Sequence, residues 1–402
     1  MRIAHVITRM ILGGAQENTL LTCEGLHARG HEVTLVTGPP LGPEGELLGR
    51  ARAGGYRLVV LGALRREINP VWDLLAYRAL CDILAELAPD VVHTHSAKAG
   101  ILGRQAAAKL RRRGGRYARL RIVHTIHGLP FHPYLPRWRN RMYIALERRA
   151  ARQTDAIISV ADAMTRQALA AGVGRPEQFT TIYSGMEMDL YLRRPAGADA
   201  FRRSLGLGPD DLLVTQVSRL AELKGHEYIL AAAGKIHDPR VHFCFVGDGR
   251  LRGRIERAVR AAGLAGRVHL TGLVPPQRIP AIMHASDIVV HCSLREGLAR
   301  ALPQAMLAGK PVVSFDVDGA AEVVDAATGV LLAPKDTVGL RRAIETLAAD
   351  PELRARLGAA GRARAMNMFD HNVMVERIER VYEEASGTDW RETLVHGRGK
   401  GE

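Results

Sequence analysis

The sequence has few cysteines and no long apolar run, and both absences narrow the range of functions. Four cysteines stand far apart in 402 residues: Cys23, Cys81, Cys244 and Cys292. No Cys-x-x-Cys pair occurs, so neither a zinc site nor a disulfide framework is indicated, and we expect a reducing cytosol. No apolar run approaches the roughly 18–20 residues that span a bilayer. The first ten residues are interrupted by His5 and Arg9, which is not typical of a signal peptide.

Acidic residues are also in the minority. The chain has 42 Asp and Glu against 56 Lys and Arg, and residues 109–121 contain no acid at all. That stretch includes the basic residues Arg111, Arg112, Arg113 and Arg116. Solvated helix ends carry such arginines without a function, whereas anionic lipid attracts clustered basic residues at about 1 kcal/mol each. These two interpretations stay open, and nucleic acid is disfavoured because no motif for binding it accompanies the charge.

The length and the order of the predicted elements indicate two α/β domains. Short β-branched strands alternate with amphipathic helices, which is the pattern of βαβ units and parallel sheets. The first series of predicted strands covers 3–8, 33–36, 57–61, 90–93, 122–127 and 156–160. After a polar break at 192–199, the second series covers 212–217, 241–246, 269–271, 288–291, 312–315 and 330–332. The predicted fold is α/β with doubly wound, Rossmann-like domains at 1–191 and 192–370, a last helix at 371–385 and a disordered tail at 386–402.

The most informative segment runs from Ser293 to Phe315. A loop with an acid and small residues opens a short apolar helix, and a Gly, a Pro and a buried-type strand follow. A loop that feeds a helix start presents backbone N–H groups to one point, which suits a diphosphate. The carboxylate of Glu296 lies beside that point and can bind sugar hydroxyls. The segment therefore predicts a nucleotide-sugar site, and Pro303 fits the first turn of a helix that begins near Arg300.

A second motif follows the predicted strand 212–217. Arg219 and Lys224 stand five residues apart in a strand-to-helix loop. A diphosphate leaving group develops negative charge as a glycosidic bond breaks, and fixed Arg and Lys donors stabilise that charge. The alternative is a solvated pair of surface charges.

Glycines and histidines mark further strand ends. Gly13 and Gly14 follow the first strand, where glycine lets the backbone approach a ligand closely. Gly247 belongs to a Gly-x-Gly turn after another strand, and His127 ends the predicted strand 122–127 and precedes a glycine. His95, with its neighbours Ser96 and Lys98, ends one more strand and is either on the acceptor side or a packing residue.

The motif His93-Thr94-His95 could place two metal ligands on one strand face. The sequence suggests no third ligand, so no metal site is predicted.

The segment around Glu296 closely resembles the E-x7-E signature of retaining glycosyltransferases of family 4 (GT4). Glu296 matches the first Glu, which contacts the donor sugar in that family. The position of the second Glu, which binds ribose, holds Gln304, and Gln can hydrogen-bond ribose hydroxyls without a charge. The layout from Gly13 to about Tyr382 resembles the GT-B fold of that family. The resemblance implies that the last helix, 371–385, crosses back to the N-terminal domain.

The resemblance implies a set of site residues. The expected catalytic residues are His127, Arg219, Lys224 and Glu296. The expected nucleotide-sugar-binding residues are Gly13, Gly14, Gly247, Val274, Gly297, Leu298, Ala299, Arg300 and Gln304.

The resemblance also implies a function. We expect a retaining, metal-independent transferase that moves a sugar from a nucleoside-diphosphate sugar, in the first instance a UDP-sugar, to a glycan or lipid-linked acceptor of cell-envelope or exopolysaccharide assembly. The expected location is the cytoplasm, at the inner membrane face if the basic residues meet anionic lipid. Two alternatives are a UDP-sugar 2-epimerase on a related fold and a non-catalytic nucleotide-sugar-binding protein, the latter suggested by Gln304.

Overall fold

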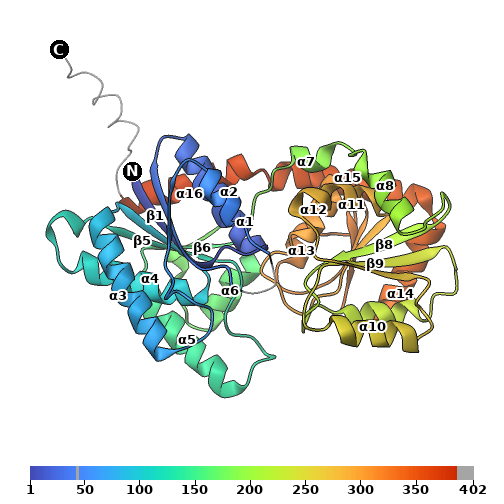
Figure 1. The fold of residues 1–402 in the computed structure, drawn as a ribbon, viewed down its shortest axis with the longest axis horizontal. Coiled ribbons are helices and arrows are strands. Elements are labelled where there is room, and N and C mark those ends of the chain that lie inside the picture. The colour runs from blue at the N-terminus through green and yellow to red at the C-terminus, as the bar shows by residue number, and fades with distance from the viewer. Residues whose placement is uncertain (42–44, 387–402) are drawn as a thin grey trace, which may run out of the picture. The chain divides into compact units, whose positions relative to one another are not determined.

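The computed structural model describes residues 1–41 and 45–386 and divides them into two compact α/β units (Figure 1). Unit 2 is Met186–Asp370, and unit 1 holds the chain before and after it. The sequence pattern predicts a domain boundary near residue 192, whereas unit 2 begins at Met186. The expected disordered tail lies outside the described residues, apart from Ser386.

Unit 1 is built on a seven-stranded parallel sheet in the order β3-β2-β1-β4-β5-β6-β7. The strands are β1 (Arg2–Arg9), β2 (Glu32–Gly38), β3 (Arg57–Val60), β4 (Val91–His95), β5 (Arg121–Ile126), β6 (Ala156–Ser159) and β7 (Phe179–Thr181). The edge strand β7 was not among the predicted strands. It has three residues, none of them fully buried, so it lacks the apolar run that marks the others.

Helices cover both faces of this sheet. They are α1 (Gly14–Ala28), α2 (Leu48–Ala53), α3 (Pro70–Leu87), α4 (Ala97–Arg111), α5 (Arg137–Ala151), α6 (Asp162–Ala170) and α16 (His371–Ser386), with the 3-10 turns η1 (Gly115–Tyr117) and η2 (Pro176–Gln178). Alternate residues of β1 pack against different helices: Ile3 and Ile7 against α1, α2 and α16, and Ala4 and Val6 against α3 and α4. His5, between Ile3 and Ile7, therefore belongs to the face covered by α1 and α16.

Helix α16 is attached to unit 1 by a buried acid as well as by apolar contacts. The carboxylate of Glu379 accepts a hydrogen bond from Arg29 Nε at 2.8 Å and lies 2.7 Å from His31 Nε2. Its side chain is 1% exposed. Because a buried carboxylate is costly unless it is paired, this contact ties α16 to the end of α1.

Unit 2 is built on a six-stranded parallel sheet in the order β10-β9-β8-β11-β12-β13. The strands are β8 (Leu212–Val217), β9 (Val241–Val246), β10 (Val268–Gly272), β11 (Ile288–His291), β12 (Val312–Phe315) and β13 (Gly329–Leu332). The two parallel sheets confirm the predicted doubly wound α/β architecture.

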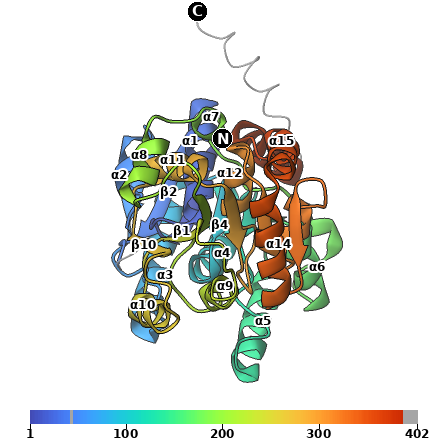
Figure 2. The ribbon, with the colours of Figure 1, turned by 90° about the vertical axis from the view of Figure 1, so that its right-hand side faces the viewer.

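The unit 2 helices also form two layers (Figure 2). They are α7 (Asp189–Leu192), α8 (Gly197–Ser204), α9 (His226–Ala233), α10 (Arg252–Ala261), α11 (Ile279–Ala285), α12 (Ala301–Leu307), α13 (Ala320–Val323), α14 (Thr337–Ala349) and α15 (Pro351–Met368), with the 3-10 turn η3 (Pro276–Arg278). Helices α9, α10 and α14 pack on one face of the sheet, and α8 and α11 pack on the other.

Both sheets contain a point where the strand order reverses. In unit 1 the reversal lies between β1 and β4, and in unit 2 between β8 and β11. Doubly wound sheets bind ligands beyond the carboxyl ends of the strands at such a point. The loops after β1, β4, β8 and β11 are therefore where a site is expected.

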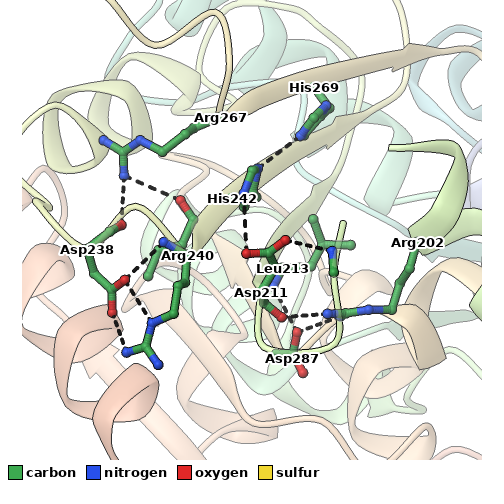
Figure 3. Close-up of polar contacts among 11 residues, drawn as sticks. Arg202, Asp211, Leu213, Asp238, Arg240, His242, Arg267, His269 and Asp287 are labelled. Carbon is green, nitrogen blue, oxygen red and sulfur yellow. Dashed lines mark hydrogen bonds and ion pairs between the residues drawn. The ribbon is translucent and has the colours of Figure 1, made fainter. Parts of the chain in front are cut away.

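Charged residues also gather at the opposite, amino-terminal edge of the unit 2 sheet, as Figure 3 shows. Arg202 pairs with Asp287 at 2.8 Å, and Asp287 in turn accepts a hydrogen bond from the backbone N–H of Leu213. On neighbouring strands, His242 Nδ1 lies 3.3 Å from His269 Nε2. These contacts join strand starts to one another and to α8, at the edge away from the expected ligand position.

Candidate functional site

The loops after β8 and β11 bring two predicted site residues into contact. The Lys224 ammonium forms an ion pair with Oε1 of Glu296, and the side chains are only 20% and 18% exposed. His291 Nε2, at the end of β11, lies 3.1 Å from the same oxygen. The backbone N–H of Glu296 donates to Asp318 at 2.6 Å. A positive and a negative side chain are thus held together at the reversal point of the sheet.

The surroundings keep Glu296 ionised. Burial raises the pKa of its carboxyl, but the Lys224 charge and the His291 hydrogen bond outweigh burial and hold the pKa well below its ordinary value. A charged carboxylate that is only partly exposed can accept hydrogen bonds from sugar hydroxyls.

The backbone that carries Lys224 is tightly constrained. Leu223 has a φ of 65°, a left-handed conformation that is uncommon for any residue with a side chain. Gly225 has a φ of 75°, and a Cβ at this position would lie 1.9 Å from the carbonyl oxygen of Cys292. The side-chain amide of Gln216 donates to the carbonyl of Lys224 at 2.9 Å. Left-handed residues of this kind cluster at functional sites, where the surroundings hold them in place.

Arg219 lies on the same loop and is exposed. Beside it, a Cβ on Gly247 would come within 2.2 Å of the carbonyl oxygen of Ser218, so only glycine fits the turn after β9. The N–H of Gly247 donates to the carbonyl of Gly272 at the end of β10. Val274 follows this strand and is half-buried. The structure therefore places the predicted residues after β8, β9 and β10 along one edge of the sheet.

The loop before α12 lies as the sequence predicted. Gly297, Leu298 and Ala299 are buried and Arg300 is half-buried. Helix α12 begins at Ala301, so Pro303 is in its first turn as expected, and the half-buried Gln304 follows.

The remaining predicted residues belong to unit 1. Gly13 directly precedes α1, Gly14 is the first residue of that helix, and His127 follows β5. Nε2 of His127 lies 3.1 Å from Nδ1 of His95. Ser96 bonds Thr8 at 2.7 Å through the two hydroxyls. The structure thus places these residues along the carboxyl edge of the unit 1 sheet.

Three contacting residues were missed by the sequence analysis. His291 was counted only as a strand residue, although its position five residues before Glu296 was a usable signal. Asp318 has a φ of 50° and lies in the segment 315–322, which was expected to close the site, but its contact with Glu296 was not predicted. His5 was read only as an interruption of an apolar run.

His5 corrects the expectation that the chain offers no third possible metal ligand beside His93 and His95. Among the described residues, these three histidines form the one cluster of His, Cys, Asp or Glu side chains with the spacing of metal ligands. Within the described part of the chain, hydrogen bonds already occupy every ring nitrogen of the three except Nε2 of His5. His93 Nδ1 and Nε2 meet Tyr382 Oη at 2.6 Å and Thr125 Oγ1 at 2.7 Å. His5 Nδ1 lies 3.0 Å from His95 Nε2. We therefore assign the cluster to hydrogen bonding.

Comparison with known proteins gives matches along most of the chain. Residues 12–190 match the family described as "Glycosyltransferase Family 4", and residues 198–364 match "Glycosyl transferases group 1". The 2-deoxystreptamine N-acetyl-D-glucosaminyltransferase of Streptomyces fradiae is 29% identical, over 87% of this chain and 86% of that protein. The UDP-Gal:alpha-D-GlcNAc-diphosphoundecaprenol alpha-1,3-galactosyltransferase of Escherichia coli is also 29% identical, over 79% and 80%.

Solved structures show the same fold. Anabaena HepE in complex with UDP and glucose superposes with a TM-score of 0.80 at 24% identity, covering 94% of this chain and 98% of that chain. Sucrose-phosphate synthase of Thermosynechococcus elongatus gives a TM-score of 0.80 at 23% identity, covering 95% and 98%. The two parallel sheets, the loops at their reversal points and the two family matches lead to one conclusion: the chain belongs to the group 1 glycosyltransferases of family 4 and has the GT-B fold.

Proposed function

We propose that the protein is a retaining glycosyltransferase that uses a UDP-sugar and needs no metal ion. The observation that carries this proposal is the contact between Lys224 and Glu296 at the reversal point of the unit 2 sheet. The contact joins a cation suited to a diphosphate and a carboxylate suited to sugar hydroxyls. The UDP complex of HepE and the UDP-galactose donor named for the Escherichia coli relative support the choice of base.

In the proposed reaction, unit 2 binds the donor and unit 1 the acceptor. Arg219 and Lys224 stabilise the diphosphate as the glycosidic bond breaks, and a fixed donor of this kind contributes about 10²-fold or more. The backbone N–H groups of Leu298, Ala299 and Arg300 add to that stabilisation. The departing phosphate oxygen takes the proton of the acceptor hydroxyl, so the new bond forms on the face that the leaving group occupied.

Glu296 and His127 orient the donor sugar in this scheme. Gln304 hydrogen-bonds the ribose, and Gly247 and Val274 line the nucleotide pocket. Gly13 and Gly14 allow the backbone of unit 1 to approach the donor phosphate and the acceptor.

Substitutions with matched controls test the proposal. Lys224→Ala, Arg219→Ala and Glu296→Gln should each lower kcat for sugar transfer by about 10²-fold. Lys235→Ala alters an exposed lysine of unit 2 and should leave kcat within about two-fold. Turnover near that of the parent in all three site variants would remove these residues from the mechanism.

Two further measurements separate the alternative functions. Incubation with the UDP-sugar alone would yield an isomerised UDP-sugar from a 2-epimerase, whereas a transferase leaves the sugar configuration of the donor unchanged. A thermal-shift screen with UDP-, GDP- and ADP-sugars identifies the base, because a ligand that binds the folded protein raises its stability. Binding without any turnover would identify a non-catalytic protein.

For the acceptor we propose a lipid-linked glycan, met at an anionic membrane surface in the cytoplasm. The Escherichia coli relative is named for a diphosphoundecaprenol acceptor. No described helix is long and apolar enough to cross a bilayer, so contact would be made by surface residues. The predicted basic residues are partly engaged elsewhere, since Arg111 pairs with Asp155 at 2.7 Å and Arg116 donates to the carbonyl of Ala85.

An apolar surface at the start of α3 is better suited to this contact. We call it the α3 surface, and its exposed side chains are Ile68 (68%), Val71 (67%), Trp72 (36%), Leu74 (48%) and Leu75 (44%). Lys98, at the start of α4 after β4, forms an ion pair with Asp73 of α3, which fixes this surface at the carboxyl edge of the sheet. Exposed apolar patches of this kind mark interaction sites.

Vesicle binding distinguishes the two surfaces. Val71→Asp with Leu75→Asp should reduce binding to anionic vesicles at least about ten-fold, because charges replace side chains that enter the lipid. Arg112→Ser with Arg113→Ser removes two exposed charges away from that edge and should reduce binding only at low salt. Equal vesicle binding by the parent and the double Asp variant would show that the α3 surface does not contact the membrane.

A further inference from the structure

Three histidines of unit 1 form a continuous hydrogen-bonded string across the sheet. His5 Nδ1 on β1 lies 3.0 Å from His95 Nε2 at the end of β4, and His95 Nδ1 lies 3.1 Å from His127 Nε2 after β5. Successive rings are stacked, with centroids 5.3 Å apart in both pairs and interplanar angles of 15° and 29°. His5 and His95 are 0% exposed. The string therefore runs from the buried centre of the sheet to a residue at its carboxyl edge.

The hydrogen bonds of such a string must all point the same way along it. A neutral imidazole carries one proton, so it donates at one nitrogen and accepts at the other. Burial lowers the pKa of His5 to about 3 and that of His95 well below its ordinary value, so both rings are neutral near pH 7. Only two arrangements then satisfy both contacts: every proton points toward His127, or every proton points toward His5.

The inner end of the string selects between these arrangements. Nε2 of His5 is buried and has no hydrogen-bond partner among the residues that the structure describes. If the protons pointed toward His5, this nitrogen would carry a buried N–H with no acceptor. Buried donors without an acceptor are rarer in proteins than acceptors without a donor. The favoured arrangement leaves Nε2 of His5 bare, so His5 donates to His95 and His95 donates to His127.

We propose that His5 and His95 are positioning residues that hold His127 in the tautomer with its proton on Nδ1. His127 Nε2 accepts from His95, which fixes the ring plane and leaves Nδ1–H as the donor. This inference rests on the proposed function, in which His127 orients the donor sugar, and gives it a direction: His127 donates a hydrogen bond to a sugar oxygen and does not accept one. The direction of a ligand histidine or catalytic histidine is set in the same way by the partner of its other nitrogen.

His93 is a matched control within the same sheet. It is as buried as His95, and their ring centroids are 4.2 Å apart. Both of its nitrogens meet hydroxyl groups, of Tyr382 and Thr125, so it lies outside the string. A change that acts only by disturbing the core should therefore have similar effects at His93 and His95, whereas a change that acts through the string should be confined to His95.

The test measures the tautomer directly. In protein labelled with 15N-histidine, the nitrogen shifts distinguish protonated from bare ring nitrogens, and the His127→Gln variant assigns the His127 signals. We expect Nδ1 of His127 to be protonated in the parent protein and in His93→Phe. In His95→Phe the preference for Nδ1 should be lost, and in His95→Asn, whose amide can replace the donor at the Nδ1 position, it should be retained.

Kinetics provide a second readout. His95→Phe should lower kcat at least ten-fold with KM for the donor within about two-fold, and His95→Asn should restore most of that loss. His93→Phe should leave kcat within about three-fold of the parent value.

Three results would overturn the inference. They are a proton on Nε2 of His127 in the parent protein, an unchanged tautomer in His95→Phe, and a stoichiometric metal ion in purified protein by plasma mass spectrometry, since a metal would displace the hydrogen bonds. The tautomer is measured without substrate, so an inactive protein with the expected tautomer would contradict the proposed function and leave this inference intact.

Discussion

Mild acid should destabilise unit 1 strongly, because its sheet buries histidines in the uncharged form. His5, His93, His95 and His124 lie on the three central strands and are at most 4% exposed. Burial lowers the pKa of His5 to about 3 and lowers the pKa of the other three well below the ordinary value. In the unfolded chain the same side chains titrate near pH 6.5.

The sign and size of the effect follow from proton linkage. Below pH 6.5 the unfolded chain binds protons that the folded sheet does not, so the free energy of unfolding falls as the pH falls. A histidine that stays uncharged in the folded protein lowers that free energy by about 1.9 kcal/mol between pH 7 and pH 5. Four such residues lower it by about 7.6 kcal/mol, which is comparable to the whole stability of a typical domain, about 5–15 kcal/mol.

Urea unfolding followed by tryptophan fluorescence measures this loss. The two tryptophans within the described residues, Trp72 and Trp138, belong to unit 1, so their signal reports that unit even if unit 2 unfolds separately. The midpoint should fall steeply from pH 7 to pH 5, and in His5→Gln the loss between these pH values should be smaller by about 1.9 kcal/mol. A total loss below about 2 kcal/mol would refute the reasoning, because it would mean that the histidines take up protons in the folded protein.

Three further predictions follow from single contacts. Gln304→Leu should weaken UDP binding measured by calorimetry, because a ribose hydroxyl would lose its partner, while Gln304→Glu should bind at least as well as the parent; equal affinity of the Leu variant and the parent would show that the ribose is held elsewhere. Glu147→Gln should lower the free energy of unfolding by about 3–5 kcal/mol, because the fully buried Arg104, which pairs with Glu147 at 2.6 Å, would lose its countercharge. A loss below about 1 kcal/mol in urea unfolding would contradict this. Gly225→Ala should cost about 2–4 kcal/mol and lower donor affinity, because its Cβ would meet the carbonyl of Cys292; a thermal midpoint equal to that of the parent would show that the loop can adjust.

The sequence predicted the strands well because parallel strands buried on both faces form compact β-branched runs. β8, β9, β11 and β12 have the predicted bounds. The loop positions of Arg219, Lys224 and Glu296 were also predictable, since motif residues followed recognisable strands. The contact between Lys224 and Glu296 was not, because it depends on β8 and β11 being neighbours although 70 residues separate them in the sequence.

The histidine string could not be predicted for the same reason. His5, His95 and His127 come from three separate strand regions, and only the order β1-β4-β5 brings them together. One part of the string was predictable: side chains alternate along a strand, so His93 and His95 must share a face of the sheet. Which residues of the other strands share that face depends on register, and His5 is aligned with His93 only because β1 pairs in parallel with β4.

Carboxylates that precede a strand in the sequence have a different role in this fold from Glu296, which follows one. Asp90, Asp155 and Asp287 each stand directly before a strand, and each accepts a hydrogen bond from a backbone N–H of a neighbouring strand at 2.7–2.8 Å. The backbone N–H of each of these residues donates in return to the neighbouring strand. These three acids therefore align strand starts at the amino edge, where no ligand is expected in a doubly wound sheet. Glu296 follows a strand and pairs with a lysine instead of a backbone group. Position after a strand therefore indicates a substrate-binding acid only together with a side-chain partner, because Asp318 also follows a strand but accepts from the backbone N–H of Glu296, as the structural acids accept from theirs.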